Sequence, residues 1–501
     1  MAVPTVAELP PTVAVLTTLC LLPVAVVVYR LFFHPLARIP GPKAGAITTF
    51  WFAYQARKGR ARELTQMLHD KYGPIVRVTP NMVWFNTAEG FREVYNGVAN
   101  KHGPIRWFPL KREAPDTLDL VAEMHMPRYR MQRRLIGPTF GAANLQSHEA
   151  AVDEVLGRFV AKLRELDGRE VDLAEWMNIL TIESLSAVTF RWSPRLIEDE
   201  TNYDTLMDGY FRFWRYFTVI GLFPRLVLLS HTLGIKSKRL LQRLVALGVE
   251  SCPTPPKNIW IDVGAQMMAQ SVGSRDLQKN PIGGLSDDLV RLHQERPEFN
   301  QEYLTEMVAT TLRAGGDTLT ASLVAVIAQA NEDQRVKQKV TDEVDIVEGI
   351  ASFQQGLNLE FTAATIKESM RHWPVIGLGM YREVPSQGMT LNGYQIPPGT
   401  TVACSPLAVH CNKAILGDDA LEFKPERWLD EGARIVLEKY SLAFGSANRS
   451  CPGRHISEQC IYKAIPTLMK HFDIEVQMPD EMLTYGTSIM NGVKARFHVR
   501  R

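Results

Sequence analysis

The segment FGSANRSCPGRH (residues 444–455) limits what this chain can be more than any other part of its sequence. Cys451 follows Arg449 by two residues and stands directly before a Pro-Gly pair. Proline is favoured in the first turn of a helix, where free backbone N–H groups and the helix dipole stabilise a thiolate. The arginine can neutralise a carboxylate, and Gly453 lets a flat cofactor lie against the backbone. A lone cysteine beside Pro-Gly is more often structural, so its role depends on the rest of the chain.

A long helix is predicted over residues 301–330, and it contains the stretch RAGGDTLTA. Each of its adjacent glycines, Gly315 and Gly316, costs about 1 kcal/mol relative to alanine inside a helix. Such glycines usually mark the close approach of another group. Asp317 and Thr318 follow directly, and an acid beside an alcohol suits proton delivery through a hydroxyl group and water.

Two charged motifs lie between that helix and Cys451. Glu368 and Arg371 are three residues apart, a spacing that by itself is common on helix surfaces. The tetrapeptide PERW, which contains Arg427, can by itself be an ordinary loop. Cys451 lies 80 residues after Arg371 and 24 residues after Arg427. The order and spacing of all four motifs, rather than any one of them, carry the information.

Together these motifs resemble those of the cytochrome P450 family, the haem-thiolate monooxygenases, over nearly the whole chain. The E-x-x-R and [AG]-G-x-[DE]-T patterns of the family are matched at residues 368–371 and 314–318. The segments YRLFFHPLARIPGPK and TLDLVAEMHMPRYRMQRRLIGPTF are similar to fungal microsomal members, above all the group containing pisatin demethylase, benzoate hydroxylase and trichothecene hydroxylases. The family signature F-x-x-G-x-R-x-C-x-G is matched at Phe444, Arg449, Cys451 and Gly453.

The resemblance implies a role for each matched residue. Cys451 would be the metal ligand, the axial thiolate of a haem b cofactor that pushes electron density onto the iron. Asp317 and Thr318 would be the catalytic residues that deliver protons. Glu368 and Arg371, completed by Arg427, would lock the haem-binding region. The other cofactor-binding residues would pack near the sulfur, leave room for the haem or face its propionates: Phe444, Gly453, Arg449, Arg133 and Arg382.

Three positions depart from the family pattern. Ala447 stands where the signature has glycine, which would cost about 1 kcal/mol if that position needs a positive φ. Leu319 replaces the usual Thr or Ser after Thr318 and should alter packing more than mechanism. Tyr129 stands four residues before Arg133, where relatives carry Trp or His, so its contact with a propionate is an open point.

Residues 9–29 carry no charge, and a helix of about 20 apolar residues spans a bilayer. A cleaved signal peptide is the alternative, but the first residues lack the basic charge that such a peptide has. We therefore expect an uncleaved membrane anchor and its flank at residues 1–36 and a haem-binding catalytic domain at residues 37–501. Basic residues follow the span and none precedes it, which predicts a single-pass protein with a cytosolic catalytic domain at the endoplasmic reticulum membrane.

The fold class expected is mainly α with small β-sheets (α+β), as in the cytochrome P450 fold. Residues 72–86 hold two β-branched and aromatic runs around a Thr-Pro-Asn turn, which predicts a hairpin. Helical patterns dominate residues 88–367, and extended runs with turns follow Arg371. The Pro/Gly-rich stretch ARIPGPKAG is predicted to be a short semi-rigid linker.

Composition excludes several functional classes. The net charge is +2, so nothing points to nucleic-acid binding. The six cysteines are too sparse for a disulfide scaffold, and no C-x-x-C pair indicates a structural zinc site. Cys404, His410 and Cys411 lie close in sequence, but we interpret them as core thiols and a strand-edge histidine rather than metal ligands.

The resemblance implies an enzyme that inserts one oxygen atom from O₂ into a lipophilic small molecule of secondary metabolism. Its electrons would come from NADPH through a partner, the NADPH-cytochrome P450 reductase. One alternative is a haem-thiolate isomerase or dehydratase that does not use O₂, and another is a membrane-anchored haem-binding protein without turnover. An intact Asp317-Thr318 pair argues against both. The substrate pocket would be lined by residues 104–115, 308–311, 375–378 and 487–489 and by the aromatic stretch after Tyr210.

Two surface features leave alternatives open. The aromatic stretch at residues 210–229 is either plain core or an element that dips into the membrane and admits an apolar substrate. Lys439, Arg454 and Lys463 either form a docking face for an acidic reductase or are ordinary solvated charges.

Overall fold

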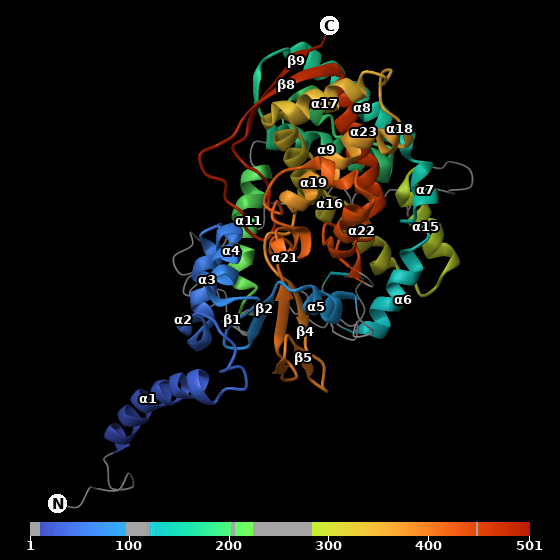
Figure 1. Cartoon of the computed structure of the whole chain (residues 1–501). Coiled ribbons are helices and arrows are strands. Elements are labelled where there is room, and N and C mark those ends of the chain that lie inside the picture. Colours follow the sequence, from blue (N-terminus) through green and yellow to red (C-terminus); the bar gives the residue numbers. More distant parts are fainter. Residues whose placement is uncertain are drawn as a thin grey trace, which may run out of the picture.

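The computed structural model of the chain is mostly helical with three small sheets, which confirms the predicted α+β class (Figure 1). It describes residues 11–96, 118, 120–121, 123, 125–201, 206–223, 283–446 and 449–500. The side chains described exclude those of residues 11, 13–20, 96 and 206–208.

Most of the helices precede Arg371 and six of the nine described strands follow it, in line with the two predicted regions. The helical elements are α1 (Pro11–Val28), η2 (Tyr29–Phe33), α2 (Lys43–Ile47), α3 (Thr49–Arg57), α4 (Ala61–Tyr72), α5 (Ala88–Phe91), η3 (Arg92–Asn96), α6 (Met126–Ile136), α7 (Ala142–Gln146), α8 (Glu149–Leu166), α9 (Leu173–Phe190), α10 (Leu196–Asp199), α11 (Leu206–Ile220), α15 (Leu285–Glu295), α16 (Gln301–Glu332), α17 (Gln334–Val344), α18 (Phe353–Asn358), α19 (Glu360–His372), α20 (Pro406–His410), α21 (Lys413–Leu416), η4 (Pro425–Trp428), α22 (Glu431–Tyr440) and α23 (Arg454–His471). The strands are β1 (Ile75–Thr79), β2 (Met82–Phe85), β3 (Glu170–Asp172), β4 (Met380–Glu383), β5 (Met389–Leu391), β6 (Tyr394–Ile396), β7 (Thr401–Cys404), β8 (Phe472–Gln477) and β9 (Lys494–Val499).

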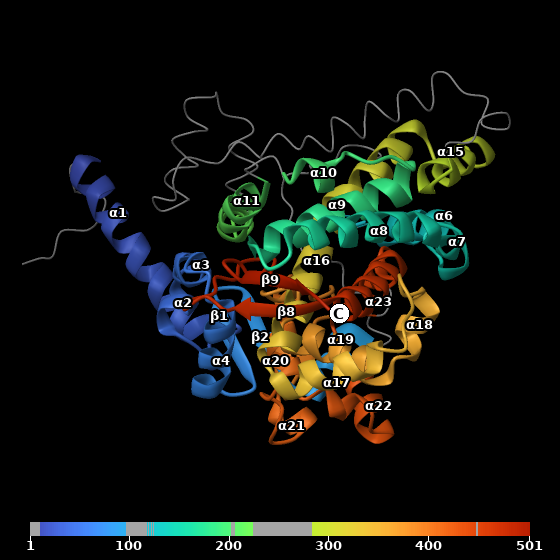
Figure 2. The same ribbon diagram turned by 90° about the horizontal axis from the view of Figure 1, so that it is seen from above.

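The long helix α16 runs through the core, as predicted. Asn300 caps it, since its side-chain oxygen accepts a hydrogen bond from the Tyr303 N–H. Its main neighbour is α9, and α8 and α10 lie beside α9 (Figure 2). A Cβ atom added at Gly315 would lie 2.7 Å from Cδ1 of Leu185 in α9. The close approach that the glycines predicted is therefore present.

The largest sheet joins the predicted hairpin to strands from far along the chain. β1 and β2 pair antiparallel, and the strand order is β1-β2-β7-β4. β7 pairs parallel with β2 and antiparallel with β4. The other sheets have the orders β3-β9-β8 and β5-β6. The sheet built around β7 places the residues after Arg371 next to the N-terminal part of the domain.

The Pro/Gly-rich stretch before α2 does not behave as a linker between separate parts. The backbone N–H of Arg77 donates to the carbonyl of Pro40 over 2.8 Å. A Cβ at Gly41 would meet the Arg77 carbonyl oxygen at 2.3 Å, so glycine is what lets the two backbones touch. The stretch is therefore packed along β1, because proline and glycine here serve a close backbone contact.

Helix α1 points away from the rest of the chain in Figure 1. Within the described residues, no helix combines the length and the apolar character that crossing a bilayer requires.

The interpretation of His410 as a strand-edge residue is wrong. It ends the short helix α20, and its side chain is buried. Cys404 is a buried thiol at the end of β7, and Cys411 follows α20 with a partly exposed side chain. The turn at Ser405-Pro406 ends the strand one residue after Cys404, because proline suits the first turn of a helix.

Candidate functional site

The Cys451 segment is a loop held by its own backbone. The Cys451 N–H donates to the carbonyl of Phe444 over 2.8 Å, and the Gly445 N–H donates to the carbonyl of Leu442 over 3.1 Å. Gly445 has φ of 76°, and a Cβ there would lie 3.0 Å from the Arg449 carbonyl oxygen. Only glycine takes this conformation without strain, so the loop closes around Gly445.

Cys451 lies just before the start of α23, whose N-cap is Gly453. The prediction that the helix start favours a thiolate is only half right. Desolvation by the surrounding protein raises the thiol pKa, and the Gly453 N–H and the Arg133 charge lower it by less. The Cys451 side chain is nevertheless exposed. An exposed sulfur is accessible to a metal ion, as a ligand must be.

Two arginines meet around Tyr129 near Cys451. The Arg449 guanidinium lies 3.6 Å from the centre of the Tyr129 ring, and Arg133 is close enough to both to affect their pKa values. Burial, then the charges of Arg382 and Arg133, lowers the Arg449 pKa to about 10. Tyr129 thus stacks against the Arg449 guanidinium.

These cations lack carboxylate partners among the residues that the structure describes. Arg449 donates to the backbone oxygens of Leu120 and Glu123 and to the Met126 sulfur, and its buried Nε has no partner in the described part of the chain. The described hydrogen bond of Arg382 goes to the Tyr381 carbonyl. Arg382 is buried, and Arg449 and Arg133 are partly buried. Withdrawing cations from water without anions is costly, so this cluster suits anionic groups.

Arg382 is positioned by a residue that the sequence did not single out. Its guanidinium lies 5.1 Å from the centre of the Tyr95 ring. The Tyr95 hydroxyl donates to the carbonyl of Met380 and accepts from the N–H of Cys404. Since Met380 and Cys404 are paired in β4 and β7, Tyr95 ties Arg382 to the end of the sheet.

An exposed sulfur and a cluster of partly or fully buried arginines match the groups of haem. Cys451 would bind the iron, and Arg449, Arg382 and Arg133 would neutralise the two propionates. The observation that favours this fit is the buried Nε of Arg449, which has no partner among the residues that the structure describes. Phe444 is packed between the core and Arg454, whose guanidinium lies 5.5 Å from its ring.

Asp317 is buried in α16, and the side-chain partners of its carboxyl group are Trp214 of α11 and Thr487 rather than the Thr318 hydroxyl. The Trp214 indole N–H donates to its Oδ2, and the Thr487 hydroxyl donates to the same oxygen over 3.3 Å. Burial raises the Asp317 pKa to about 6, and these two hydrogen bonds lower it by less. The carboxyl group is therefore partly protonated near neutral pH.

Thr318 has a different environment. Its side chain is partly exposed, and its hydroxyl donates to the Ala314 carbonyl over 2.7 Å. The described side-chain hydrogen bonds of Asp317 and Thr318 do not join the two residues, although they are adjacent in sequence. The predicted pair is thus one buried acid and one exposed alcohol.

Two aromatic residues on α11 contact this turn of α16. A Cβ at Gly316 would lie 2.9 Å from the Tyr210 hydroxyl, so the second glycine makes room for tyrosine. Burial, with a smaller effect of the Asp317 charge, raises the Tyr210 pKa. Sequence reasoning missed Trp214 and Tyr210 as partners of Asp317. Their spacing of four residues in a helix was the available signal.

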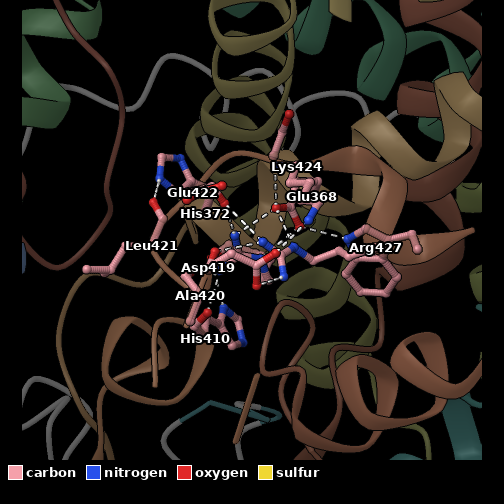
Figure 3. Close-up of polar contacts among 12 residues, drawn as sticks. Glu368, His372, His410, Asp419, Ala420, Leu421, Glu422, Lys424 and Arg427 are labelled. Carbon is pink, nitrogen blue, oxygen red and sulfur yellow. Dashed lines mark hydrogen bonds and ion pairs between the residues drawn. The ribbon is translucent and has the colours of Figure 1, made fainter. Parts of the chain in front are cut away.

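Glu368, Arg371 and Arg427 form the buried network that the motifs predicted (Figure 3). Arg371 donates through Nε and Nη2 to the two oxygens of Glu368, at 2.8 and 2.7 Å. Arg427 Nε and the Trp428 indole N–H also donate to Glu368, at 3.0 and 2.9 Å. These partners outweigh the burial that opposes them and lower the Glu368 pKa. The network joins α19 to η4.

The predicted lining segments divide into two groups. Residues 375–378 and 487–489 lie side by side, with Ile376 bridged to Thr487 and the Ser488 N–H bonded to the Val375 carbonyl. Thr487 in turn contacts Asp317 of α16, the helix that also carries residues 308–311. Residues 104–115 and 224–229 and the departure at Ala447 lie outside the described residues. Leu319 is packed in the core.

One predicted docking residue is wrongly assigned. Lys463 is fully buried, and its ammonium group contacts Glu149 at 2.7 Å and Asp153 at 2.6 Å. It ties α23 to α8 because a buried lysine needs carboxylate partners. Lys439 and Arg454 are exposed.

Comparison with known proteins agrees with this geometry. The family model for cytochrome P450 matches residues 40–494. The chain is 39% identical to a cytochrome P450 monooxygenase, sdnT, of Sordaria araneosa, over 95% of this chain and 94% of the relative. It is 28% identical to a trichothecene C-4 hydroxylase of Trichoderma arundinaceum (90% and 89% covered) and 27% identical to a pisatin demethylase of Fusarium vanettenii (92% and 90%). The chain therefore belongs to the cytochrome P450 family and is an enzyme of its monooxygenase class.

Proposed function

We propose that this enzyme inserts one oxygen atom from O₂ into a lipophilic small molecule of fungal secondary metabolism, with electrons from NADPH. The observation that carries the proposal is the exposed sulfur of Cys451 close to partly or fully buried arginines that lack carboxylate partners among the described residues. When bound there, haem would supply the iron that activates O₂, and a thiolate ligand favours cleavage of the O–O bond.

The residues of the chain have separate tasks in this proposal. Cys451 holds the iron, and Arg449, Arg382 and Arg133 offset the charge of the propionates. Thr318 presents a hydroxyl on the exposed side of α16. Asp317, with a pKa of about 6, can take up and release a proton at its carboxyl group near neutral pH.

The substrate class is inferred from the relatives and the apolar lining. A trichothecene C-4 hydroxylase and a pisatin demethylase both match over about nine-tenths of their length. Two of the described lining segments meet beside Asp317 and include Val375, Ile376 and Ile489. A lipophilic secondary metabolite fits these side chains, because apolar contacts dominate the binding of such molecules.

The electron donor in this proposal is the NADPH-cytochrome P450 reductase, docked on the face that carries Cys451. Lys439 and Arg454 are exposed, and both suit an acidic partner. Replacing both by glutamate should slow reduction by the reductase and leave reduction by dithionite unchanged. If the reductase reduced the wild type and the double variant at the same rate, Lys439 and Arg454 would not form the docking site.

The proposal places the enzyme at the endoplasmic reticulum membrane, anchored by residues 1–36 with the catalytic domain, residues 37–501, in the cytosol. Support comes from apolar side chains that are at least 60% exposed, namely Leu21, Leu22, Phe32 and Phe33. A glycosylation acceptor fused before residue 1 should be modified in microsomes, and one fused after residue 501 should not. The opposite pattern would mean that the catalytic domain lies in the lumen and the N-terminus in the cytosol.

The central test is spectroscopic. The reduced protein with CO should show the red-shifted Soret band of a thiolate ligand, and Cys451→Ala should abolish it. Cys411→Ala is the control, since this partly exposed thiol lies outside the site. A Cys451→Ala protein that keeps the band would overturn the site assignment.

Turnover separates the monooxygenase from the alternatives. With candidate substrates and the reductase, product formation should require both NADPH and O₂. Turnover without either would indicate an isomerase or dehydratase. A thiolate-type band without any NADPH consumption would indicate a haem-binding protein that has no turnover.

A further inference from the structure

His410 lies between the Glu368 network and the Cys451 loop. It is 3% exposed and ends helix α20. The Leu442 N–H donates to Nε2 of its ring over 2.8 Å. The Nδ1 atom of the ring lies 3.2 Å from the carbonyl oxygen of Arg371. The imidazole therefore spans two backbone groups that lie far apart in the sequence.

These two contacts define the protonation state of the ring. A backbone N–H can only donate, so Nε2 must accept from Leu442 and carry no proton. The ring proton is then on Nδ1, where it donates to the Arg371 carbonyl. Burial, and then the charge of Arg371, lowers the His410 pKa to about 4. The neutral ring that the geometry requires is thus the form present at neutral pH.

One side of the ring is held by a rigid, fully bonded cluster (Figure 3). The Arg371 guanidinium donates to the carbonyl of His410 itself and to that of Ala420. The same guanidinium is paired with Glu368, which is fully buried. His410 is consequently bonded to Arg371 through both its backbone and its ring.

The other side of the ring leads to Cys451. Leu442, whose N–H the ring accepts, offers its own carbonyl to the Gly445 N–H. Phe444, between them in the loop, accepts from the Cys451 N–H over 2.8 Å. The place where the chain enters the Cys451 loop is therefore set by a hydrogen bond from outside the loop.

We propose that His410 is a positioning residue that couples the Glu368 network to the Cys451 loop through its hydrogen bond to Leu442. The inference rests on the proposed role of Cys451 as the haem ligand. If the ring no longer accepts from Leu442, a buried N–H loses its partner and the entry to the loop is no longer fixed. The sulfur is then held in place less well, whereas the fold of the domain remains.

Two isosteric replacements separate the two hydrogen bonds. In His410→Gln the side-chain oxygen can take the position of Nε2 and accept from Leu442. In His410→Asn the amide group can reach only the Nδ1 position and bond to the Arg371 carbonyl. His410→Phe keeps the ring shape and removes both bonds. His372→Gln is the control, because His372 contacts Gln329 and Leu421 instead of Leu442.

The experiment measures the full-length, haem-loaded variants in two ways. The first is the rate at which the thiolate-type CO band is lost on incubation, and the second is the thermal unfolding midpoint. We expect His410→Asn and His410→Phe to lose the band about tenfold faster than wild type, the effect of one unpaired buried N–H. His410→Gln should stay near the wild-type rate, and His372→Gln should lower the midpoint without changing the rate.

The result that overturns the inference is equal decay in His410→Asn and His410→Gln, or decay in all variants that simply follows the unfolding midpoint. If His410→Phe fails to fold, the comparison of His410→Asn with His410→Gln still tests the inference. A wild-type protein without any thiolate-type band would instead contradict the proposed role of Cys451, which keeps the two failures distinct.

Discussion

At the scale of single residues, the surroundings of Asp317 in α16 change the pKa of its carboxyl group. Asp317 is buried, and its carboxyl group accepts from Trp214 and Thr487, which are neutral donors. Neutral hydrogen bonds offset part of the cost of burying a charge, but the raised pKa of about 6 shows that burial is the larger effect. A proton donor near neutral pH is the result.

The Asp317→Asn variant should therefore change the pH dependence of stability. A group whose pKa rises from 3.8 to about 6 on folding contributes stability below pH 4 that is lost as the pH rises through 6. Two pKa units correspond to about 3 kcal/mol. The free energy of unfolding of Asp317→Asn, relative to wild type, should thus rise by about 3 kcal/mol between pH 4 and pH 8.

Asp288 provides a control of opposite sign. Burial opposes its charge, but the hydrogen bonds from His148 and Asn144 lower its pKa overall. Its contribution to stability is present at neutral pH and lost on acidification, so Asp288→Asn should be most destabilising at neutral pH. Denaturant unfolding at several pH values measures the free energy of unfolding of Asp317→Asn and of Asp288→Asn relative to wild type. A pH-independent difference for Asp317→Asn would contradict the raised pKa.

At the scale of elements, glycines decide how closely helices pack. A Cβ at Gly356 in α18 would lie 1.8 Å from the Tyr462 carbonyl oxygen of α23. This neighbour is backbone, which cannot move aside as a side chain can. At Gly157 in α8, by contrast, a Cβ would meet no atom within 4 Å.

These two positions make a matched pair of predictions. Gly157→Ala should stabilise the enzyme by up to about 1 kcal/mol, because alanine is the better helix former. Gly356→Ala should destabilise it by about 2 kcal/mol or more, since the overlap forces α18 away from α23. Thermal unfolding of the two variants measures the difference. Stabilisation by both would mean that α18 does not pack against α23 as described.

At the scale of the whole molecule, one buried carboxylate connects distant parts of the chain. Glu368 accepts hydrogen bonds from Arg371, Arg427, Trp428 and the Lys424 N–H. Removing one partner of a buried ion pair leaves uncompensated charge and costs about 3–5 kcal/mol. Glu368→Gln should therefore lower the free energy of unfolding by about that amount.

The same variant should also fail to keep its haem, because the network, through His410 and Leu442, holds the chain where it enters the Cys451 loop. Haem content per protein, measured by absorbance after purification, checks this. Glu426→Gln is the control, since Glu426 is in the same PERW motif but pairs with Arg335 and Lys339 near the surface. Equal haem content in both variants would contradict the role given to the buried network.

Two neutral histidines next to this network predict acid sensitivity. Burial, followed by nearby arginines, lowers the pKa of both His410 and His372 to about 4. Arg371 and Glu368 act on both rings, and Arg62 acts on His372. A lowered pKa contributes stability that is present above pH 6.5 and lost as the pH falls through 4. His372→Gln should flatten the decline in unfolding free energy between pH 6.5 and pH 4.5, and an unchanged slope would contradict it.

The sequence by itself determined the family, the α+β class and the motifs. The residue types and the spacing of Cys451, Glu368, Arg371 and Arg427 are sufficient to identify the motifs. The hairpin, the long helix and its glycine contacts followed from local chemistry in the same way. Only the tertiary structure decided which side chains meet across the chain. Asp317 contacts Trp214, and Arg449 stacks on Tyr129. Lys463 is buried in an ion pair, and His410 accepts a hydrogen bond from Leu442. These contacts depend on packing between elements far apart in sequence, and no spacing along a single chain encodes that packing directly.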